Sequence, residues 1–582
     1  MMKKLVSLLL CGTCALAIPF AGCDRGGENQ TIDEGKTQLY VKYYNGGLGR
    51  EWIDNVITSF EQDYANYSFE EGKTGVQIMK DFEKANVNVT EMKETSNQVF
   101  LLVDTNYFEF VTNDVMLDIT DVVQGKAALS PDSSENVTVE SKITEDRKAF
   151  YNWGDESNPE YYALPFFENS INLNYNVDLF ERKGFYFKKG ATAEGMSQEE
   201  LNSFTSVAPL FVGVDTTAER SYGPDGKTGI DGATGVNYSL DDGLPATYDD
   251  FAALVTYIRT GNVLPFIWNG YEPGYLTCLA NDMWANNEGL EQMSLNFDFD
   301  GTATDLVVFD EQGNVKYKAD GSVETLPATP ITNSNAYMLQ AQKGKLEAIE
   351  LIKIIMGNKD NYYTSAFSPS FTHEDAQNYF ISGYDKGYID KEIAMLVEGT
   401  WWNREGSKFY GSPEEKMTKR FAILPLPKSD ASAIGENNTK VTERQSLIFI
   451  NKYCDESVIP AAKTFVSYLQ SDKAMNTFSQ YTDMLRAMNY DLTEDTLSKM
   501  SYYGRNVYEF SRSATTDWIE WLPTSDVTKK NFSMLSYRKW GYSTAANKDN
   551  PFEYFYKDKS NTSRDDYFEA IYKYRETVWS LK

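Results

Sequence analysis

The chain has 582 residues, of which 85 are Asp or Glu and 55 are Lys or Arg, so its formal net charge is -30. A surface of this sign repels phosphate backbones, which argues against a nucleic-acid partner. The length exceeds what one hydrophobic core can organise, and the 41% hydrophobic content predicts at least two packed domains.

The N-terminus has the pattern of a secretory signal. A basic start precedes an apolar run over 5–20, and small residues lead to Cys23. The run is shorter than the about 20 residues that a transmembrane helix needs. The small residues before Cys23 resemble a bacterial lipobox, in which this cysteine carries the lipid; the alternative is an ordinary signal peptide with an incidental cysteine. We expect a signal peptide over 1–22 and a lipidated, polar tether over 23–37.

The next segments predict a β-α-β unit. Alternation of apolar and polar residues over 39–44 predicts a strand, and a glycine loop follows it. Apolar residues at helical spacing predict a helix over 51–64, and a second strand is expected over 99–103. This order is typical of an α/β domain with parallel strands.

Strands and helices continue to alternate further along the chain. The expected strands are 161–165, 170–175, 262–268 and 393–397, and the expected helices are 249–259, 274–288 and 344–356. Residues 223–242 are rich in Gly, Asp and Thr, which predicts a long surface loop, and 306–318 predict a β-hairpin between helices.

The residues from Ser501 onward are denser in aromatic side chains than the chain average of 14%. We interpret most of them as helices that pack onto the second half of the protein. Trp518 and Trp521 are spaced to share one helix face, and either could reach a ligand cleft.

Few motifs for catalysis or metal binding are present. Only Cys278 and Cys454 lie beyond Cys23, which excludes a disulfide-stapled fold and argues against a cysteine-based zinc site. The sole histidine, His373, is interpreted as a solvated structural residue. The Gly-Lys-Thr triplets lack the earlier glycine of a phosphate loop, and 298–301 are interpreted as a turn rather than a calcium loop. No cofactor or metal is expected.

Aromatic and amide side chains gather at the ends of predicted strands. Trp268, Tyr271 and Tyr275 flank a glycine turn, and Trp401 and Trp402 follow another strand. One interpretation is that these rings cap a core. The other is a stacking platform for sugars, whose C–H faces pack on aromatic rings and whose hydroxyls bind amides and carboxylates.

Several short motifs follow one another in a recognisable order. They are Tyr44-Asn45-Gly46-Gly47, Leu117-Asp118-Ile119-Thr120, Tyr162-Ala163-Leu164-Pro165, the stretches 174–180 and 244–251, Glu398-Gly399-Thr400-Trp401 and the stretch 422–427. Together they resemble the extracellular solute-binding proteins of family 1, the carbohydrate receptors of ABC importers. The resemblance covers residues 38–490 and leaves the C-terminal segment unmatched.

The resemblance implies a two-lobe α/β fold of the periplasmic-binding-protein type II class, with a hinge and a ligand cleft between the lobes. The expected first lobe comprises 38–167 and 418–476. The expected second lobe comprises 168–417 and 477–582.

The resemblance also implies a set of ligand contacts. The candidate ligand-binding residues are Asn45, Asn106, Tyr107, Asn169, Trp268, Tyr271, Glu272, Tyr275, Trp401 and Trp402. Trp401 takes the place of a stacking tryptophan. Asn106, Tyr107 and Asn169 stand where the family has charged residues, which puts the family's best-known sugar ligand in doubt.

The sequence thus predicts a monomeric lipoprotein, anchored through Cys23 on the extracytoplasmic face of the cell membrane. It is expected to bind a sugar or oligosaccharide, without catalysis, and to deliver it to ABC permease subunits and their ATPase. Two alternatives stay open: a secreted glycan-active hydrolase with two carboxylates in one cleft, and a binding lipoprotein for a non-sugar ligand such as a peptide or a sugar acid.

Overall fold

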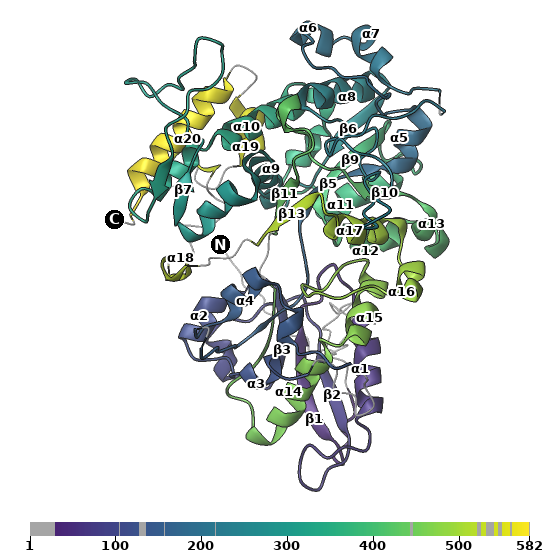
Figure 1. The fold of residues 1–582 in the computed structure, drawn as a ribbon. Coiled ribbons are helices and arrows are strands. Elements are labelled where there is room, and N and C mark those ends of the chain that lie inside the picture. The colour runs from purple at the N-terminus through teal and green to yellow at the C-terminus, as the bar shows by residue number, and fades with distance from the viewer. Residues whose placement is uncertain are drawn as a thin grey trace, which may run out of the picture.

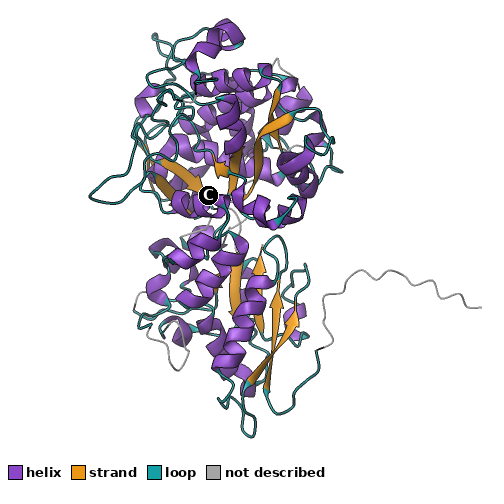
Figure 2. Ribbon diagram, turned by 90° about the vertical axis from the view of Figure 1, so that its right-hand side faces the viewer, coloured by secondary structure: helices purple, strands orange, loops and turns teal. Residues whose placement is uncertain are grey.

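The structure is a computed structural model that describes residues 30–103, 105–126, 135–155, 157–215, 217–442, 446–520, 525–530, 540–544, 550–558 and 562–580. Cys23 and Trp521 lie outside these residues. Figures 1 and 2 show two α/β bodies, one above the other. We call the lower body, which contains strand β1, the first lobe and the upper body the second lobe.

The first lobe is built on a five-stranded sheet in the order β2-β1-β3-β12-β4. β1 (Thr37–Tyr43) pairs in parallel with β2 (Val76–Asp81) and β3 (Val99–Val103). β12 (Ser446–Ile450) runs antiparallel to both β3 and β4 (Leu164–Pro165). The predicted β-α-β unit is confirmed, but β2 was not predicted.

Helices cover this sheet through apolar faces. α1 (Glu51–Asp63) buries Trp52 and Phe60, whose rings lie 5.0 Å from those of Phe478 and Phe465. These partners belong to α15 (Asp472–Thr482) and α14 (Ile459–Tyr468). The remaining helices of this lobe are α2 (Tyr107–Thr112), α3 (Thr120–Val123) and α4 (Glu145–Tyr151).

The second lobe is built on a four-stranded sheet in the order β10-β5-β9-β6. β9 (Glu392–Gly399) pairs in parallel with β6 (Val263–Ile267) and antiparallel with β5 (Ile171–Asn176). β10 (Phe421–Ile423) pairs antiparallel with the other edge of β5. All four strands are largely buried, and β5 buries the polar side chains of Asn172 and Asn174 as well as its apolar ones.

The long helices of the second lobe begin and end where their sequences dictate. Thr247 caps α8 (Tyr248–Thr260) through a capping box with Asp250. α9 (Gly274–Asp298) kinks at Gly289, which has a φ of 75°. The predicted helix ended at residue 288, directly before this kink. The other helices here are α5 (Val177–Lys183), α6 (Gln198–Leu201), α7 (Phe204–Val207), α10 (Lys343–Met356), α11 (His373–Asn378), α12 (Trp402–Glu405), α13 (Pro413–Thr418) and α16 (Glu494–Lys499).

The hairpin and the long loop that the sequence predicted are both present. β7 (Gly301–Ala303) and β8 (Thr329–Ile331) pair antiparallel and enclose the expected hairpin, in which Phe309 bridges to Val315. Residues 223–242 form a loop without regular secondary structure.

The C-terminal segment is only in part helical. It contains α17 (Tyr502–Ser511), α18 (Asp526–Lys530), α19 (Pro551–Asp558) and α20 (Arg564–Val578). It also contains a strand, β13 (Thr516–Ile519), which pairs in parallel with β11 (Asn438–Val441). Trp518 therefore lies on a strand, and the prediction that it occupies a helix face was wrong.

Two elements correct the predicted lobe boundaries. β10 pairs with β5 in the second sheet, although the predicted division gave 418–476 to the first lobe. The chain returns to the sheet of the first lobe only at β12, which follows β11. α15 packs on α1 of the first lobe, so the last crossing follows Thr482 rather than residue 476. The first crossing between the two sheets lies between β4 and β5.

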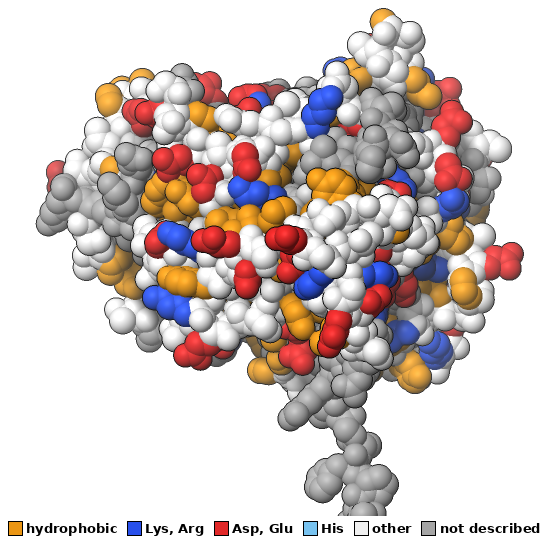
Figure 3. Space-filling model, turned by 90° about the horizontal axis from the view of Figure 1, so that it is seen from below, with side chains coloured by type: hydrophobic (Ala, Val, Ile, Leu, Met, Phe, Trp, Pro, Cys, Tyr) orange, Lys and Arg blue, Asp and Glu red, His pale blue; other side chains and the backbone are white. Residues whose placement is uncertain are grey.

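Charge on the outer surface is mixed in sign over the face seen from below, at the end of the first lobe. Carboxylates, Lys and Arg side chains and apolar groups alternate there (Figure 3). On this face, the acidic side chains are thus interspersed with basic ones rather than gathered into one patch.

Candidate ligand-binding site

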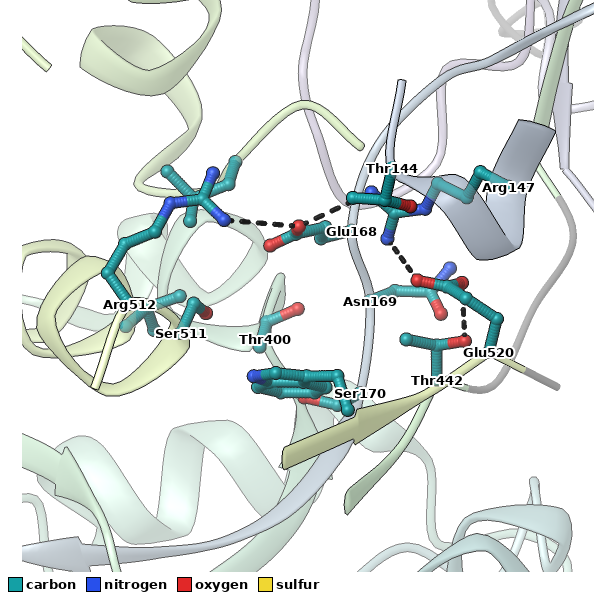
Figure 4. A pocket seen from close by; sticks show the side chains of 13 residues that line it. Thr144, Arg147, Glu168, Asn169, Ser170, Thr400, Thr442, Ser511, Arg512 and Glu520 are labelled. Atoms are coloured by element: carbon teal, nitrogen blue, oxygen red, sulfur yellow. Dashed lines mark hydrogen bonds and ion pairs between the residues drawn. The ribbon is translucent and has the colours of Figure 1, made fainter. Parts of the chain in front are cut away.

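A cavity of about 100 Å³ lies where the chain crosses between the two lobes (Figure 4). Its walls come from the first lobe, the second lobe, the crossing segments and the C-terminal segment. The lining residues are Thr144, Arg147, Glu168, Asn169, Ser170, Thr400, Thr442, Leu485, Val507, Ser511, Arg512, Trp518 and Glu520.

Arg147 of α4 forms the first-lobe wall. Its guanidinium lies 3.5 Å from a carboxylate oxygen of Glu168 and 2.5 Å from one of Glu520. Burial alone would lower the pKa of Arg147, but Glu520 and Glu168 outweigh it and raise that pKa. Arg147 thus stays charged and ties α4 to the C-terminal segment.

The C-terminal segment closes the opposite wall. Arg512, just after α17, lies 3.7 Å from Glu168, and the Thr442 hydroxyl donates to Glu520 at 2.9 Å. Trp518 of β13 also lines the cavity. Figure 4 shows Glu168 between the two arginines and Glu520 beside Thr442. The part of the chain that the resemblance left unmatched therefore supplies five of the thirteen lining residues.

The floor is formed at the end of β9. The backbone N–H of Thr400 donates to the Ser170 carbonyl at 3.1 Å, which joins β9 to the crossing segment. Asn169 is 3% exposed and lines the cavity beside them. Of the predicted candidates, Asn169 is the one that the structure places in the cavity wall.

A second group of candidates surrounds Trp401, the residue after Thr400. The indole of Trp401 meets the ring of Tyr275 edge-on, with centroids 5.8 Å apart. It also lies against Gly47 of the first lobe, in the loop that carries Asn45. Arg404, one turn further, forms an ion pair with Glu51 at the start of α1. The structure thus brings Tyr275, Trp401 and the loop that carries Asn45 to one junction between the lobes.

Three candidates belong to the lobe cores instead. Tyr107, Trp268 and Trp402 are each 0% exposed, so their side chains cannot touch a ligand in this arrangement. The Tyr107 hydroxyl donates to the Tyr151 carbonyl at 2.8 Å. Trp268 packs on Tyr362, Phe367 and Phe552, and Trp402 packs on Phe380, Phe421 and Tyr503. All three rings are thus packed in the lobe cores in this arrangement.

The other candidates lie outside the cavity wall. Asn106 caps α2, because its side-chain oxygen accepts from the Glu109 N–H at 3.3 Å. Tyr271 is 58% exposed in the turn before α9. The backbone N–H of Glu272 donates to Asn269 at 2.7 Å.

Sequence reasoning missed Arg147, Glu168, Thr400, Arg512 and Glu520. Glu168 and Thr400 directly precede Asn169 and Trp401, so their positions at a strand end and at a crossing were available signals. Arg147, Arg512 and Glu520 gave no signal, because single charges in polar segments do not reveal their partners.

Among the described residues, no three His, Cys, Asp or Glu side chains are grouped to hold a metal ion. Within the same residues, no helix is both long and apolar enough to cross a membrane.

Comparison with known proteins gives a match in fold. No protein-family model and no curated protein sequence matches the chain. Among solved structures, the bacterial solute receptor AcbH, described as exclusive for β-D-galactopyranose, matches with a TM-score of 0.51 and 10% identity over 93% of this chain and 98% of its own. This chain has the fold of the solute-binding proteins.

Two further solute-binding structures are similar. A chitin oligosaccharide binding protein matches with a TM-score of 0.49 and 12% identity, over 94% of this chain and 99% of its own. RafE in complex with raffinose matches with a TM-score of 0.48 and 12% identity, over 94% of this chain and 100% of its own. The two sheets of this chain, each with its covering helices, form the two-lobe α/β architecture expected from the sequence.

Proposed function

We propose that this protein is the substrate-binding component of an ABC importer and captures a sugar or oligosaccharide between its lobes. The observation that carries the proposal is the cavity beside Asn169 and Thr400, which is lined from both lobes and from the segments that join them. Solute-binding proteins close around their ligands by hinge motion, so a site at this junction couples binding to closure.

The chemistry of the junction suits a carbohydrate. Trp401 and Tyr275, which are 8% and 7% exposed in this arrangement, would offer aromatic faces to the C–H faces of a sugar ring when the lobes open. Asn169, Thr400 and Asn45 offer amide and hydroxyl groups that both donate and accept hydrogen bonds. The receptor with a TM-score above 0.5 is described as binding a galactopyranose, which supports a sugar rather than a peptide.

A hydrolase would need one carboxyl group free to act as an acid and a second to act as base or nucleophile. Among the described lining residues, Glu168 and Glu520 are the two carboxylates, and both are bound to Arg147. This arrangement favours positioning over catalysis.

The anchor and the delivery step belong to the same proposal. Cys23 would carry the lipid, and the tether over 23–37 would let the lobes reach permease subunits at the membrane. The expected result for Cys23→Ala is release of protein that still binds its ligand, with impaired uptake by the cells. Undiminished uptake by cells that express the variant would contradict the need for an anchor.

The direct test is calorimetric titration of the mature protein with D-galactose, raffinose, maltotriose and chitin oligosaccharides. We expect saturable binding of at least one of them with no turnover. Absence of binding across the panel would overturn the sugar assignment, and hydrolysis of a bound glycan would overturn the non-enzymatic one.

A further inference from the structure

Two polar atoms on the cavity wall have no hydrogen-bond partner among the described residues. They are the hydroxyl oxygen of Thr400 and the indole nitrogen of Trp518, and both are buried. Thr400 as a whole is 5% exposed. Buried polar groups in native proteins nearly always have a partner, and leaving one unmade costs about 1–3 kcal/mol. Both residues line the same cavity, Thr400 directly after β9 and Trp518 on β13.

Charged groups on the same wall are already satisfied. Arg147 pairs with Glu168 and Glu520, and Arg512 pairs with Glu168. These are the four charged residues among the described residues that line the cavity, and their two positive and two negative charges sum to zero. An anionic ligand would have to break one of these pairs, whereas a neutral ligand would not.

The size of the cavity limits its occupant. A water molecule needs about 10–15 Å³ of such volume, so a cavity of about 100 Å³ accommodates several waters or one sugar ring, but not a chain of rings.

We propose, on the basis of the proposed function, that this cavity takes one neutral pyranose unit, whose hydroxyls pair with Thr400 and with the indole N–H of Trp518. The Trp518 N–H donates to a sugar oxygen, and the Thr400 hydroxyl donates or accepts. β13 in the C-terminal segment thus contributes a residue that determines specificity.

The variants Thr400→Val and Trp518→Phe test this assignment: the first replaces the hydroxyl by a methyl group of similar size, and the second removes the indole N–H together with part of the ring. Since the Thr400 hydroxyl has no partner among the described residues, the melting temperature of ligand-free Thr400→Val should stay the same or rise. Trp518→Phe should lose some stability, because the smaller ring leaves a void. The affinity for the bound sugar should fall about tenfold in each variant, as expected for one lost hydrogen bond.

Two matched controls come from the same fold. Thr439 on β11 and Trp268 in the second-lobe core also have buried polar atoms without a partner among the described residues, but neither lines the cavity. Thr439→Val and Trp268→Phe should therefore leave the affinity unchanged. D-galactose and D-galacturonate form a matched pair of neutral and anionic probes, and the neutral sugar should bind at least tenfold more tightly.

The outcomes separate this inference from the proposed function. If a sugar binds but Thr400→Val and Trp518→Phe bind it as the unmodified protein does, the inference falls and the function stands. Tighter binding of D-galacturonate than of D-galactose would overturn the neutral assignment. A clear loss of melting temperature in ligand-free Thr400→Val would show that the Thr400 hydroxyl has a structural partner, against the premise. If no saccharide of the panel binds, both proposals fall.

Discussion

The indole ring of Trp401 lies directly against Gly47, which belongs to the other lobe. A Cβ atom at Gly47 would come within 3.1 Å of Trp401 Cδ1, and the ring is only 8% exposed. The face expected to stack on a sugar is therefore covered by the glycine loop of the first lobe. A ligand that stacks on this ring has to displace the loop. Trp401 therefore becomes accessible only when the lobes open.

Gly47→Ala should hold the lobes apart. The added Cβ meets the Trp401 ring, and the φ of +74° costs an L-residue about 1 kcal/mol. Gly72→Ala is the matched control, because Gly72 has a φ of +79° with nothing within 4 Å of its Cβ position. Urea denaturation should show a similar loss of stability in both variants. Small-angle scattering should show a larger radius of gyration for Gly47→Ala alone, and equal radii for the two would refute the contact.

The ion pair between Arg404 and Glu51 joins the same two segments across the lobes. Since Glu51 is about half exposed, the pair should contribute no more than about 0.5 kcal/mol and should weaken with salt. Glu51→Gln should lower ligand affinity about twofold in dilute buffer, with the difference lost near 1 M NaCl. Glu374→Gln breaks the pair with Lys408, which lies within the second lobe, and should leave the affinity unchanged at any salt concentration. Equal effects of both variants would contradict an interlobe role.

The sequence predicts the elements better than it predicts the site. Strand 99–103 and the first helix are local patterns of apolar residues, and both were predicted almost to the residue. The hydrophobic character of Trp268 and Trp402 does not say whether their rings face a core or a ligand, because both environments are apolar. The cavity depends on pairs far apart in sequence, such as Arg147 with Glu520, and no local pattern encodes such a pair.

Neighbouring tryptophans at the end of β9 should respond differently to truncation. Trp402 is fully buried among aromatic rings, so Trp402→Ala should cost about 3–5 kcal/mol of unfolding free energy. Trp401 lies at the junction of the lobes, so Trp401→Ala should cost less stability and lower ligand affinity at least tenfold. Chemical denaturation and calorimetry of both variants check this. A Trp401→Ala variant with unchanged affinity would remove Trp401 from the ligand site.

Asp241, near the end of the long surface loop over 223–242, should make stability depend on pH. Its side chain is 4% exposed and accepts from the Asp225 N–H at 3.0 Å. Burial, with the nearby charge of Asp225, raises the pKa of Asp241 to about 8, whereas the unfolded chain has a value near 3.9. The folded protein thus holds this proton more tightly than the unfolded chain. The resulting stabilisation is complete below about pH 4 and is lost as the pH rises towards 8.

Asp241→Asn keeps a side-chain oxygen for the Asp225 N–H and removes the ionisation. The variant should match or exceed the unmodified protein at pH 5 and be more stable by about 1 kcal/mol or more at pH 9. Asp231→Asn is the control in the same loop, because hydrogen bonds from the Ala233 and Thr234 N–H groups lower the pKa of Asp231. Asp231→Asn should therefore give no gain in stability at high pH. Melting temperatures measured from pH 5 to 9 decide the matter: a constant difference between Asp241→Asn and the unmodified protein would mean that Asp241 titrates alike in the folded and unfolded states.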